Sequence, residues 1–343
     1  MPIYITVALA LIPSLLLVRF FQLHDAFPEP PRQIWMTFFL GALTIFPVLL
    51  LTYPLMQALP LPENPFLRGL FISFVFAAIP EEFFKLLVLT RYSFRRRVFD
   101  EPMDGIVYGA VVGQGFAAFE NVLYSVSGGA GIAIGRALTA VPAHACMGVI
   151  MGYYVGKARF DSENRAACIF KGFLFAVLVH GFYNTPLLTM QSMMGIDGEF
   201  PPGSEGIIGA LMLGTLCVLL GSIIWSLGIA HNARKAQINR EVPPPIPSPP
   251  DLPKSPGEKG GPSYAFGLLT VLWGLVLSAC GGAMTSGGLR TVFSSNVDGP
   301  TYAIMLAALL VLGIFPLISG LVLFNTGVRR INEARRASAE VQP

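Results

Sequence analysis

Long apolar runs recur along this chain of 343 residues and constrain its fold more than any other feature. A run of ~20 apolar residues is long enough to cross the hydrocarbon core of a bilayer as an α-helix. Hydrophobic residues make up 53% of the chain and charged residues 13%, about half the charged share of a typical soluble domain. The sequence therefore predicts an all-α polytopic membrane protein.

The apolar runs also predict how the chain is divided. We expect nine transmembrane helices, at 3–23, 34–56, 66–90, 103–126, 137–156, 168–190, 206–230, 264–287 and 301–325. No basic residue precedes the first run, which favours a retained span over a cleaved signal peptide. The expected divisions are a membrane core (1–232, with its polar motifs in 66–190), a Pro-rich cytoplasmic linker (233–263), a two-helix transmembrane extension (264–325) and a basic cytoplasmic tail (326–343).

Loop charge predicts the orientation in the membrane. Nineteen of the 23 Lys and Arg residues fall in the loops and tail of one side, three fall on the other side, and Lys85 falls inside a span. The positive-inside rule then places the N-terminus outside and the C-terminus in the cytoplasm. The net charge of +3 follows from this bias, so the lipid bilayer is an expected partner and nucleic acid is not.

Four consecutive spans carry ionisable or amide side chains in their apolar interior. These residues are Glu81, Glu82, Lys85, Glu120, His144, His180 and Asn184. An ionisable group in a spanning helix costs at least about 2.5–3.5 kcal/mol, and such groups usually face one another or a water-filled cavity. Helical rise places most of them at similar depth near the bilayer middle. The sequence therefore predicts one buried polar site.

The third span carries two glutamates and a lysine. Lys85 is i,i+4 from Glu81 and i,i+3 from Glu82, so it can meet either carboxylate. The two glutamates point ~100° apart on a helix, so one can face a reacting water while the other pairs with Lys85. A buried ion pair that only fastens helices is the alternative, although it leaves one glutamate unexplained. Pro80 is expected to bend this span and make room for water.

The fourth and fifth spans add one residue each. Glu120 shares a helix face with Phe116 and Tyr124, which we expect to support it, although a solvated interfacial glutamate would show the same pattern. His144 is either a packed side chain or a member of the site. Glycines 109, 113 and 115 precede Glu120 in the fourth span and predict the close approach of a neighbouring helix.

The sixth span carries His180 and Asn184 at i,i+4, which suits two donors aimed at an oxyanion or a hydrogen-bonded pair between helices. A carboxylate in a low-dielectric site can act as a general base, and no Ser or Cys nucleophile accompanies a histidine at a telling spacing. Glutamate-activated water is therefore favoured over covalent catalysis. His144, His180 and Glu120 could also hold Zn²⁺, but no H-E-x-x-H motif is present, so metal dependence stays open.

Four motifs together resemble the PrsW family of intramembrane proteases, a group exemplified by site-1 cleavage of an anti-sigma factor and related to the CAAX prenyl endopeptidases. The motifs are EEFFK (81–85), FAAFENVLY (116–124), His144 and HGFYN (180–184). The resemblance covers residues 66–190. It implies a hydrolase of glutamic or metallo type in the bacterial inner membrane, and a membrane-anchored, anti-sigma-factor-like protein as substrate.

The resemblance also implies roles for the site residues. Glu81 would activate water, with Glu82 and Lys85 shaping its charge. Glu120 would help hold that water, His180 and Asn184 would stabilise the oxyanion, and His144 would complete the cavity. The last motif ends in asparagine where some related proteins have aspartate, which weakens a metal-ligand role at that position.

Two other functions compete with the protease. A non-catalytic membrane scaffold or binding protein could use the same polar core for packing, as a distantly related subunit of the gamma-secretase complex is thought to do. A proton-coupled transporter could use Glu and His as a proton relay, but it predicts an internal repeat that the two halves of the chain do not show.

Overall fold

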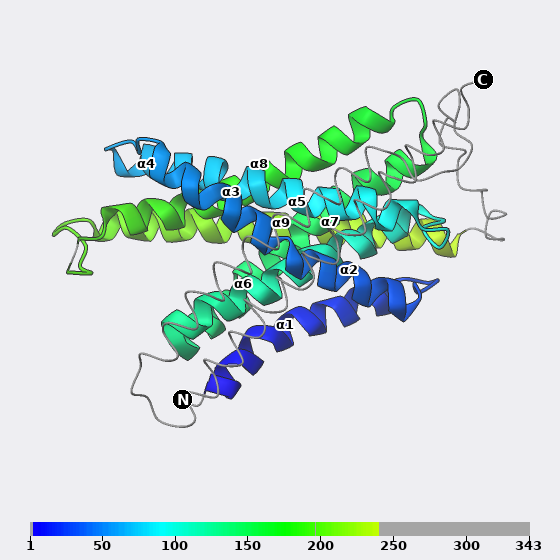
Figure 1. Ribbon diagram of the computed structural model, residues 1–343, viewed down its shortest axis with the longest axis horizontal. Coiled ribbons are helices and arrows are strands. Elements are labelled where there is room, and N and C mark those ends of the chain that lie inside the picture. The colour runs from blue at the N-terminus through cyan, green and yellow to red at the C-terminus, as the bar shows by residue number, and fades with distance from the viewer. Residues whose placement is uncertain (1–2, 196, 240–343) are drawn as a thin grey trace, which may run out of the picture. The chain divides into compact units, whose positions relative to one another are not determined.

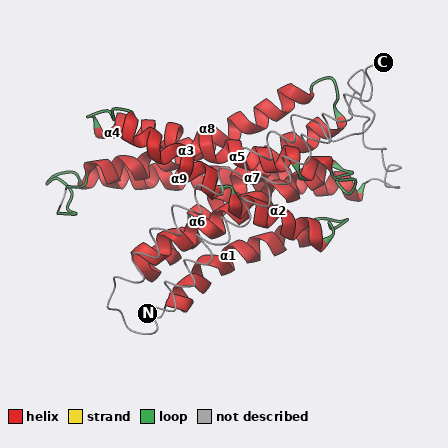
Figure 2. Ribbon diagram, viewed as in Figure 1, coloured by secondary structure: helices red, strands yellow, loops and turns green. Residues whose placement is uncertain are grey.

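The computed structural model describes residues 3–195 and 197–239, and every regular element in them is a helix (Figures 1 and 2). The helices are α1 (Ile3–His24), α2 (Pro31–Leu43), α3 (Ile45–Ala58), α4 (Pro65–Phe71), the π-helix η1 (Ile72–Ala78), α5 (Ile79–Arg91), the short 3₁₀ helix η2 (Ser93–Arg95), α6 (Pro102–Leu138), α7 (Ala140–Phe160), α8 (Arg165–Met193) and α9 (Glu205–Ile238).

The expected all-α membrane fold is confirmed, but the count of nine spans is not. Five stretches of the described chain are long and apolar enough to cross a membrane: Tyr4–His24, Pro31–Ala58, Pro102–Phe160, Arg165–Met193 and Glu205–Ile238. The expected third span is built from α4, η1 and α5 and is not among the five. The expected eighth and ninth spans and the basic tail lie outside the described residues.

The fourth helix is longer than expected. The apolar run predicts a span that ends at residue 126, yet α6 continues to Leu138 and bends at Gly129, where φ is 74°. Arg136, one of the three basic residues that the loop charges assign to the outer side, therefore lies on a helix. Likewise α9 continues past residue 232 to Ile238, into the expected linker. Both differences arise because small or polar residues end a hydropathy signal without ending a helix.

Glycines let α6 pack closely on its neighbours, as the sequence predicts. A Cβ on Gly109 would lie 2.1 Å from the Gly148 carbonyl oxygen of α7, and one on Gly113 would lie 2.5 Å from the His144 carbonyl oxygen. A Cβ on Gly115 would lie 2.0 Å from a carbonyl oxygen of α2. Backbones in such close contact fix α6 between α2 and α7, and α6 and α7 carry much of the buried core.

The third span changes helix type just before its charged motif. The Ile79 N–H donates to the Phe74 carbonyl in the i→i+5 pattern of a π-helix, and Pro80 follows. Proline has no N–H and its ring crowds the carbonyl of residue i−4, so a wider turn relieves the clash at that point. The bend expected at Pro80 is thus accommodated by η1, directly ahead of Glu81 and Glu82.

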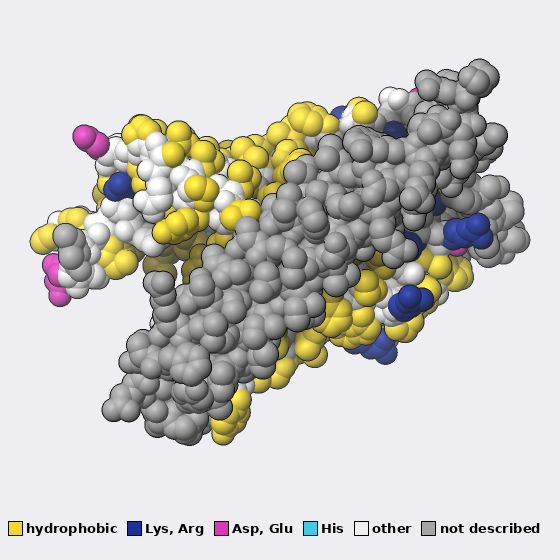
Figure 3. Space-filling view, viewed as in Figure 1, with side chains coloured by type: hydrophobic (Ala, Val, Ile, Leu, Met, Phe, Trp, Pro, Cys, Tyr) yellow, Lys and Arg dark blue, Asp and Glu magenta, His cyan; other side chains and the backbone are white. Residues whose placement is uncertain are grey.

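Charged side chains separate along the bundle. Most of the Lys and Arg side chains visible in Figure 3 gather at one end, here called the basic end, where α1, α5, α7 and α9 finish and α6 begins. The α1–α2 turn packs inward there: the Tyr108 hydroxyl donates to Glu29 (2.5 Å), and burial raises the pKa of the Glu29 carboxyl to about 7. The orientation of this end in the membrane stays a prediction.

Candidate active site

Four helices bring the residues predicted for the site together. Helix α5 carries Glu81, Glu82 and Lys85. Glu120 lies on α6, His144 lies on α7, and α8 carries both His180 and Asn184. Hydrogen bonds or shared cavity walls join all seven. The seven residues therefore form one cluster, as expected.

Glu82 is the carboxylate committed to pairing. Its side chain is fully buried, and its Oε1 accepts from Lys85 Nζ (2.8 Å) and from His180 Nδ1 (2.8 Å). Its other oxygen, Oε2, is buried with no hydrogen-bond partner among the described residues. A carboxylate oxygen without a partner in a buried site is costly, so it needs an additional ligand or proton.

Glu81 occupies a different environment from its neighbour. Its Oε2 lies 3.5 Å from Lys85 Nζ and 3.8 Å from His180 Nε2, both longer than the contacts of Glu82. Glu81 also lines a cavity of about 860 Å³, which Glu82 does not. An ion pair that only fastens helices would account for Glu82 and Lys85, but it would not account for a second carboxylate at the wall of a cavity.

His144 connects Lys85 to Glu120. Its Nδ1 lies 3.1 Å from Lys85 Nζ and its Nε2 lies 3.1 Å from Glu120 Oε2. An ammonium group only donates, so Nδ1 accepts and Nε2 carries the proton that it donates to the carboxylate. The ring also packs against that of Phe116, with centroids 5.4 Å apart, and the Phe116 ring lies 4.1 Å from Lys85 Nζ.

Arg136 is the member of the site that the sequence did not reveal. Its guanidinium forms an ion pair with Glu120 and donates from Nε to Asn121 Oδ1 (3.2 Å). It also lies over the ring of Tyr124, the residue expected to share a helix face with Glu120. Glu120 is therefore mostly buried and ion-paired rather than a solvated interfacial glutamate. The sequence carries only a weak signal for Arg136, which is one of the three basic residues that the loop charges assign to the outer side of the membrane.

Polar side chains of the cluster line two cavities. Glu81, Arg136 and Asn184 lie in the wall of the 860 Å³ cavity, which reaches α3 and η1. A second cavity of about 340 Å³ is lined by His144, His180 and also Asn184. Glu120 contributes to both cavities. The larger volume falls within the range of small-ligand and peptide-side-chain sites.

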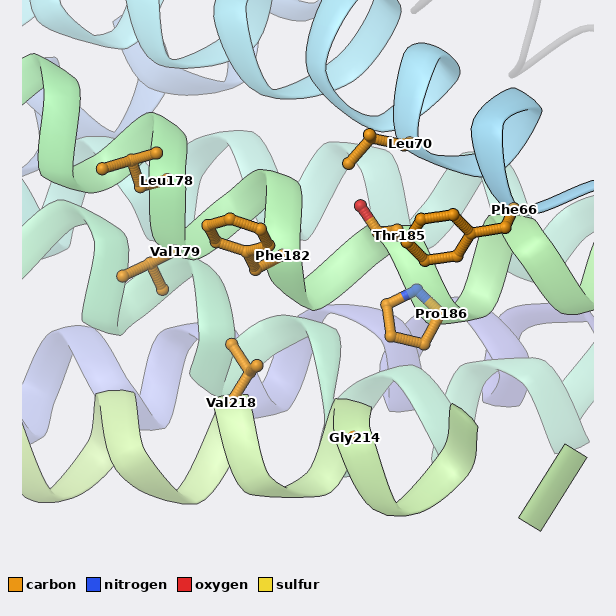
Figure 4. A pocket seen from close by; sticks show the side chains of 9 residues that line it. All are labelled: Phe66, Leu70, Leu178, Val179, Phe182, Thr185, Pro186, Gly214 and Val218. Atoms are coloured by element: carbon orange, nitrogen blue, oxygen red, sulfur yellow. The ribbon is translucent and has the colours of Figure 1, made fainter. Parts of the chain in front are cut away.

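A third hollow, of about 390 Å³, lies between α4, α8 and α9. Figure 4 shows Phe66 from α4, Phe182 and Pro186 from α8 and Val218 from α9 in its wall. No ionisable residue lines it, so it offers packing surface but no acid–base chemistry.

The cluster has the donor set of a metal site. Glu81, Glu82, His144 and His180 each offer a ligand atom, and these atoms lie within 4.8 Å of one another. Glu82 Oε2 has no hydrogen-bond partner among the described residues, so it is available to bind a metal ion. His180 is also suited to bind one, because its Nδ1–H donates to a carboxylate and its Nε2 accepts no hydrogen bond there. The predicted set of His144, His180 and Glu120 differs: Glu120 is ion-paired outside the four, and the two glutamates of α5 replace it.

A family model described as "PrsW family intramembrane metalloprotease" matches residues 29–222. The chain belongs to the PrsW family. It is thus an integral membrane protein and an intramembrane protease, as the four motifs implied, and the match to the PrsW family extends well beyond residues 66–190.

Individual relatives agree with the family model. Protease PrsW of Geobacillus kaustophilus is 38% identical over 180 residues, which are 52% of this chain and 78% of the relative. The PrsW protease of Bacillus subtilis is 37% identical over 182 residues, 52% of this chain and 81% of the relative. The PrsW protease of Clostridioides difficile is 30% identical over 186 residues, which are 52% of this chain and 78% of the relative. No solved structure was found to match. These relatives are named proteases, which gives no support to the scaffold or the transporter.

Proposed function

We propose that this PrsW family protease hydrolyses a peptide bond of a membrane-anchored protein with water activated by Glu81. One observation carries the assignment: of the two adjacent glutamates, Glu81 lines the large cavity, whereas Glu82 is fully buried under Lys85 and His180. A general base must reach the proton that it abstracts, and only a group at the cavity wall can do so.

The reaction needs two proton transfers. Glu81 takes a proton from water while the water oxygen bonds to the scissile carbonyl carbon, which leaves a negative charge on the carbonyl oxygen. The carbon–nitrogen bond then breaks, and Glu81 returns its proton to the leaving amine. The Asn184 amide lies at the wall of both cavities and would donate to the oxyanion.

The neighbouring residues position these groups. Glu82 orients His180 by accepting its Nδ1–H, and Lys85 offsets the negative charge of both glutamates. The Nδ1–H of His180 is therefore not free for the oxyanion, and its Nε2 faces Glu81 instead. Glu120, fixed by Arg136 and His144, would accept a second hydrogen bond from the attacking water.

A divalent metal ion, with Zn²⁺ as the first candidate, would be held from among Glu81, Glu82, His144 and His180. Such an ion lowers the pKa of bound water and polarises the scissile carbonyl. Glu82 Oε2 and His180 Nε2 are the donor atoms left available for it. The remaining roles of the chain, which are orientation, proton transfer and oxyanion binding, are the same with or without the ion.

The cavity wall favours an apolar substrate segment. Apolar residues of α3 and η1, among them Val48, Leu49 and Ile72, line the cavity together with its polar groups. A transmembrane or juxtamembrane segment of the substrate, unwound at the cleaved bond, fits this combination. We propose a membrane-anchored regulatory protein of the anti-sigma-factor type as substrate and the bacterial cell membrane as location, with the N-terminus outside.

Cleavage of a reporter membrane protein by wild type and by Glu81→Gln tests the assignment. Glutamine keeps the shape and loses the base, so the rate should fall by about 10²–10⁴-fold. Glu63→Gln, an exposed glutamate between α3 and α4, is the matched control and should cleave like wild type. Unchanged cleavage by folded Glu81→Gln would remove Glu81 from the mechanism.

A chelator arm separates the two ways of activating water. If cleavage by wild type is lost on chelation and restored by Zn²⁺, the metal shares the activation of water. If cleavage resists chelation, Glu81 acts alone. Melting temperatures in detergent, measured in parallel, show whether each protein is folded.

A further inference from the structure

A second cluster of buried carboxylates lies at the basic end, apart from the catalytic site. Asp25 and Glu29 belong to the α1–α2 turn, and Glu101 and Asp104 to the start of α6. All four are at most 6% exposed. Asp25, Glu101 and Asp104 each offer a carboxylate oxygen, and these oxygens lie within 4.8 Å of one another.

Neutral groups donate to this acidic cluster. Gln237 of α9 donates from Nε2 to Asp25 Oδ1 (2.8 Å) and to Glu101, so it bridges the two carboxylates. The backbone N–H groups of Asp100 (2.7 Å) and Glu101 (2.8 Å) both donate to Asp104 Oδ2. These bonds satisfy one oxygen of each aspartate and carry no positive charge to the cluster.

The remaining aspartate oxygens lack a donor among the described residues. Asp25 and Asp104 are 96% and 99% buried, yet Asp25 Oδ2 and Asp104 Oδ1 accept no hydrogen bond from an N–H or hydroxyl group of that part of the chain. Both side chains converge on the same small volume. Two orphaned carboxylate oxygens in one buried cluster indicate a ligand that accepts electron pairs.

The described residues supply no cationic partner to the two aspartates. No Lys or Arg among them forms an ion pair with Asp25, Glu29 or Asp104. The buried arginine at this end, Arg159, directs its guanidinium to the backbone carbonyls of Phe99 (3.1 Å), Phe94 and Arg96 instead. Burying several carboxylates together without a compensating cation is strongly unfavourable.

We propose that this acidic cluster binds one hard divalent cation, Mg²⁺ or Ca²⁺. Every available donor is an oxygen, which is the ligand type that both ions prefer. The catalytic cluster, in contrast, contains imidazole and suits a softer ion such as Zn²⁺. At the helical rise of α6, Asp104 lies roughly 24 Å from Glu120, so the two sites are separate.

The cation would join three segments that are distant in sequence. Asp25 follows α1, Asp104 lies in the first turn of α6, and Gln237 lies in the last turn of α9. Bound between them, the ion would hold the α1–α2 turn and the end of α9 against the start of α6. Its role is to stabilise this end of the bundle, and it takes no part in peptide hydrolysis.

Metal binding to the purified full-length protein tests the proposal. Metal-stripped protein in detergent is titrated with Ca²⁺ alone and with Mg²⁺ alone, with bound metal and melting temperature as readouts. Wild type should bind one ion and melt at a higher temperature with it. Asp25→Asn/Asp104→Asn keeps the shape of both side chains. This variant should bind the ion at least tenfold more weakly, and adding metal should not raise its melting temperature.

Asp197→Asn is the matched control, because this exposed aspartate lies in the α8–α9 loop away from the cluster, and it should behave like wild type. If the double variant does not fold, Asp25→Asn alone replaces it and should also weaken binding at least tenfold. The proposal is overturned if wild type binds neither ion, or if the variant binds as well as wild type. It is also overturned if the metal-free double variant melts higher than wild type does with metal, because the ion would then not offset the cost of burying the carboxylates.

Discussion

Lys85 is held in the protein interior by three acceptors, Glu81, Glu82 and His144, from two helices. Its side chain is 1% exposed and lies over the ring of Phe116. A charge so deeply buried is tolerated because hydrogen bonds and opposite charges surround it. Lys85 therefore determines how much negative charge the cluster of the candidate active site can hold.

Replacing Lys85 should destabilise the fold. Lys85→Met leaves two glutamates buried without their cation, and we expect a loss of about 3–5 kcal/mol in the free energy of unfolding. Lys85→Met/Glu82→Gln should recover part of that loss, because one orphaned charge is removed. Denaturant unfolding in detergent measures both. Lys171→Met, at an exposed position of α8, is the control, and an equal effect at the two lysines would contradict the expectation.

The sequence predicted which residues meet but not how they pair. All seven polar residues stand out because they interrupt apolar runs, and the structure joins them. Helix spacing permits Lys85 to pair with either glutamate. Which glutamate it contacts more closely depends on His180, which binds Glu82 from a position 98 residues further along the chain. Arg136 escaped prediction because the glycine-rich stretch before it ends the apolar signal while α6 continues.

At the scale of elements, the contact of α6 with α7 sets the distance between Glu120 and His144. The two helices approach through facing glycines, where the carbonyl oxygen of one backbone occupies the place of a side chain on the other. The glycine spacing predicted the close approach, since small residues permit it in membranes. Which helix would be the neighbour was not readable from the spacing alone.

Gly109→Ala should separate these helices. The added Cβ would lie 2.1 Å from the Gly148 carbonyl oxygen, and backbone cannot move aside cheaply. Overpacking of this kind costs about 1–3 kcal/mol, so the melting temperature should fall, and cleavage should fall with it. Gly221→Ala on α9 is the control because its Cβ would meet nothing within 4 Å. Equal melting temperatures for the two variants would refute this account of the contact.

At the scale of the whole molecule, the residues of the candidate active site and of the acidic cluster occupy the first part of the chain. Residues 1–249 form one compact unit, the family match covers 29–222, and every residue of both clusters lies before 239. The apolar runs predicted the helical, membrane-embedded character of this unit because span length follows from bilayer thickness. The expected count of nine is not confirmed, because two of the nine lie beyond the described residues and the third is not among the five long apolar stretches.

A chain that ends at Pro249 should retain protease activity. It keeps the catalytic cluster, both cavities and the acidic cluster, so reporter cleavage should stay within about threefold of the full-length rate, less than 1 kcal/mol in activation free energy. The same truncation carrying Glu81→Gln is the inactive control. A folded but inactive truncated chain would show that residues 250–343 contribute to catalysis.

The π-helical turn has a consequence for anyone who draws the third span as a helical wheel. One extra residue in a turn shifts the angular phase of everything after it by about 100°. The side chains of α4 and those of α5 must therefore be plotted on two separate helical wheels, because the helical phase changes within Ile72–Ala78. A single wheel drawn through residues 65–91 would assign Glu81 and Glu82 to the wrong faces relative to Arg68, and a labelling scan along the span should be read in two separate phases.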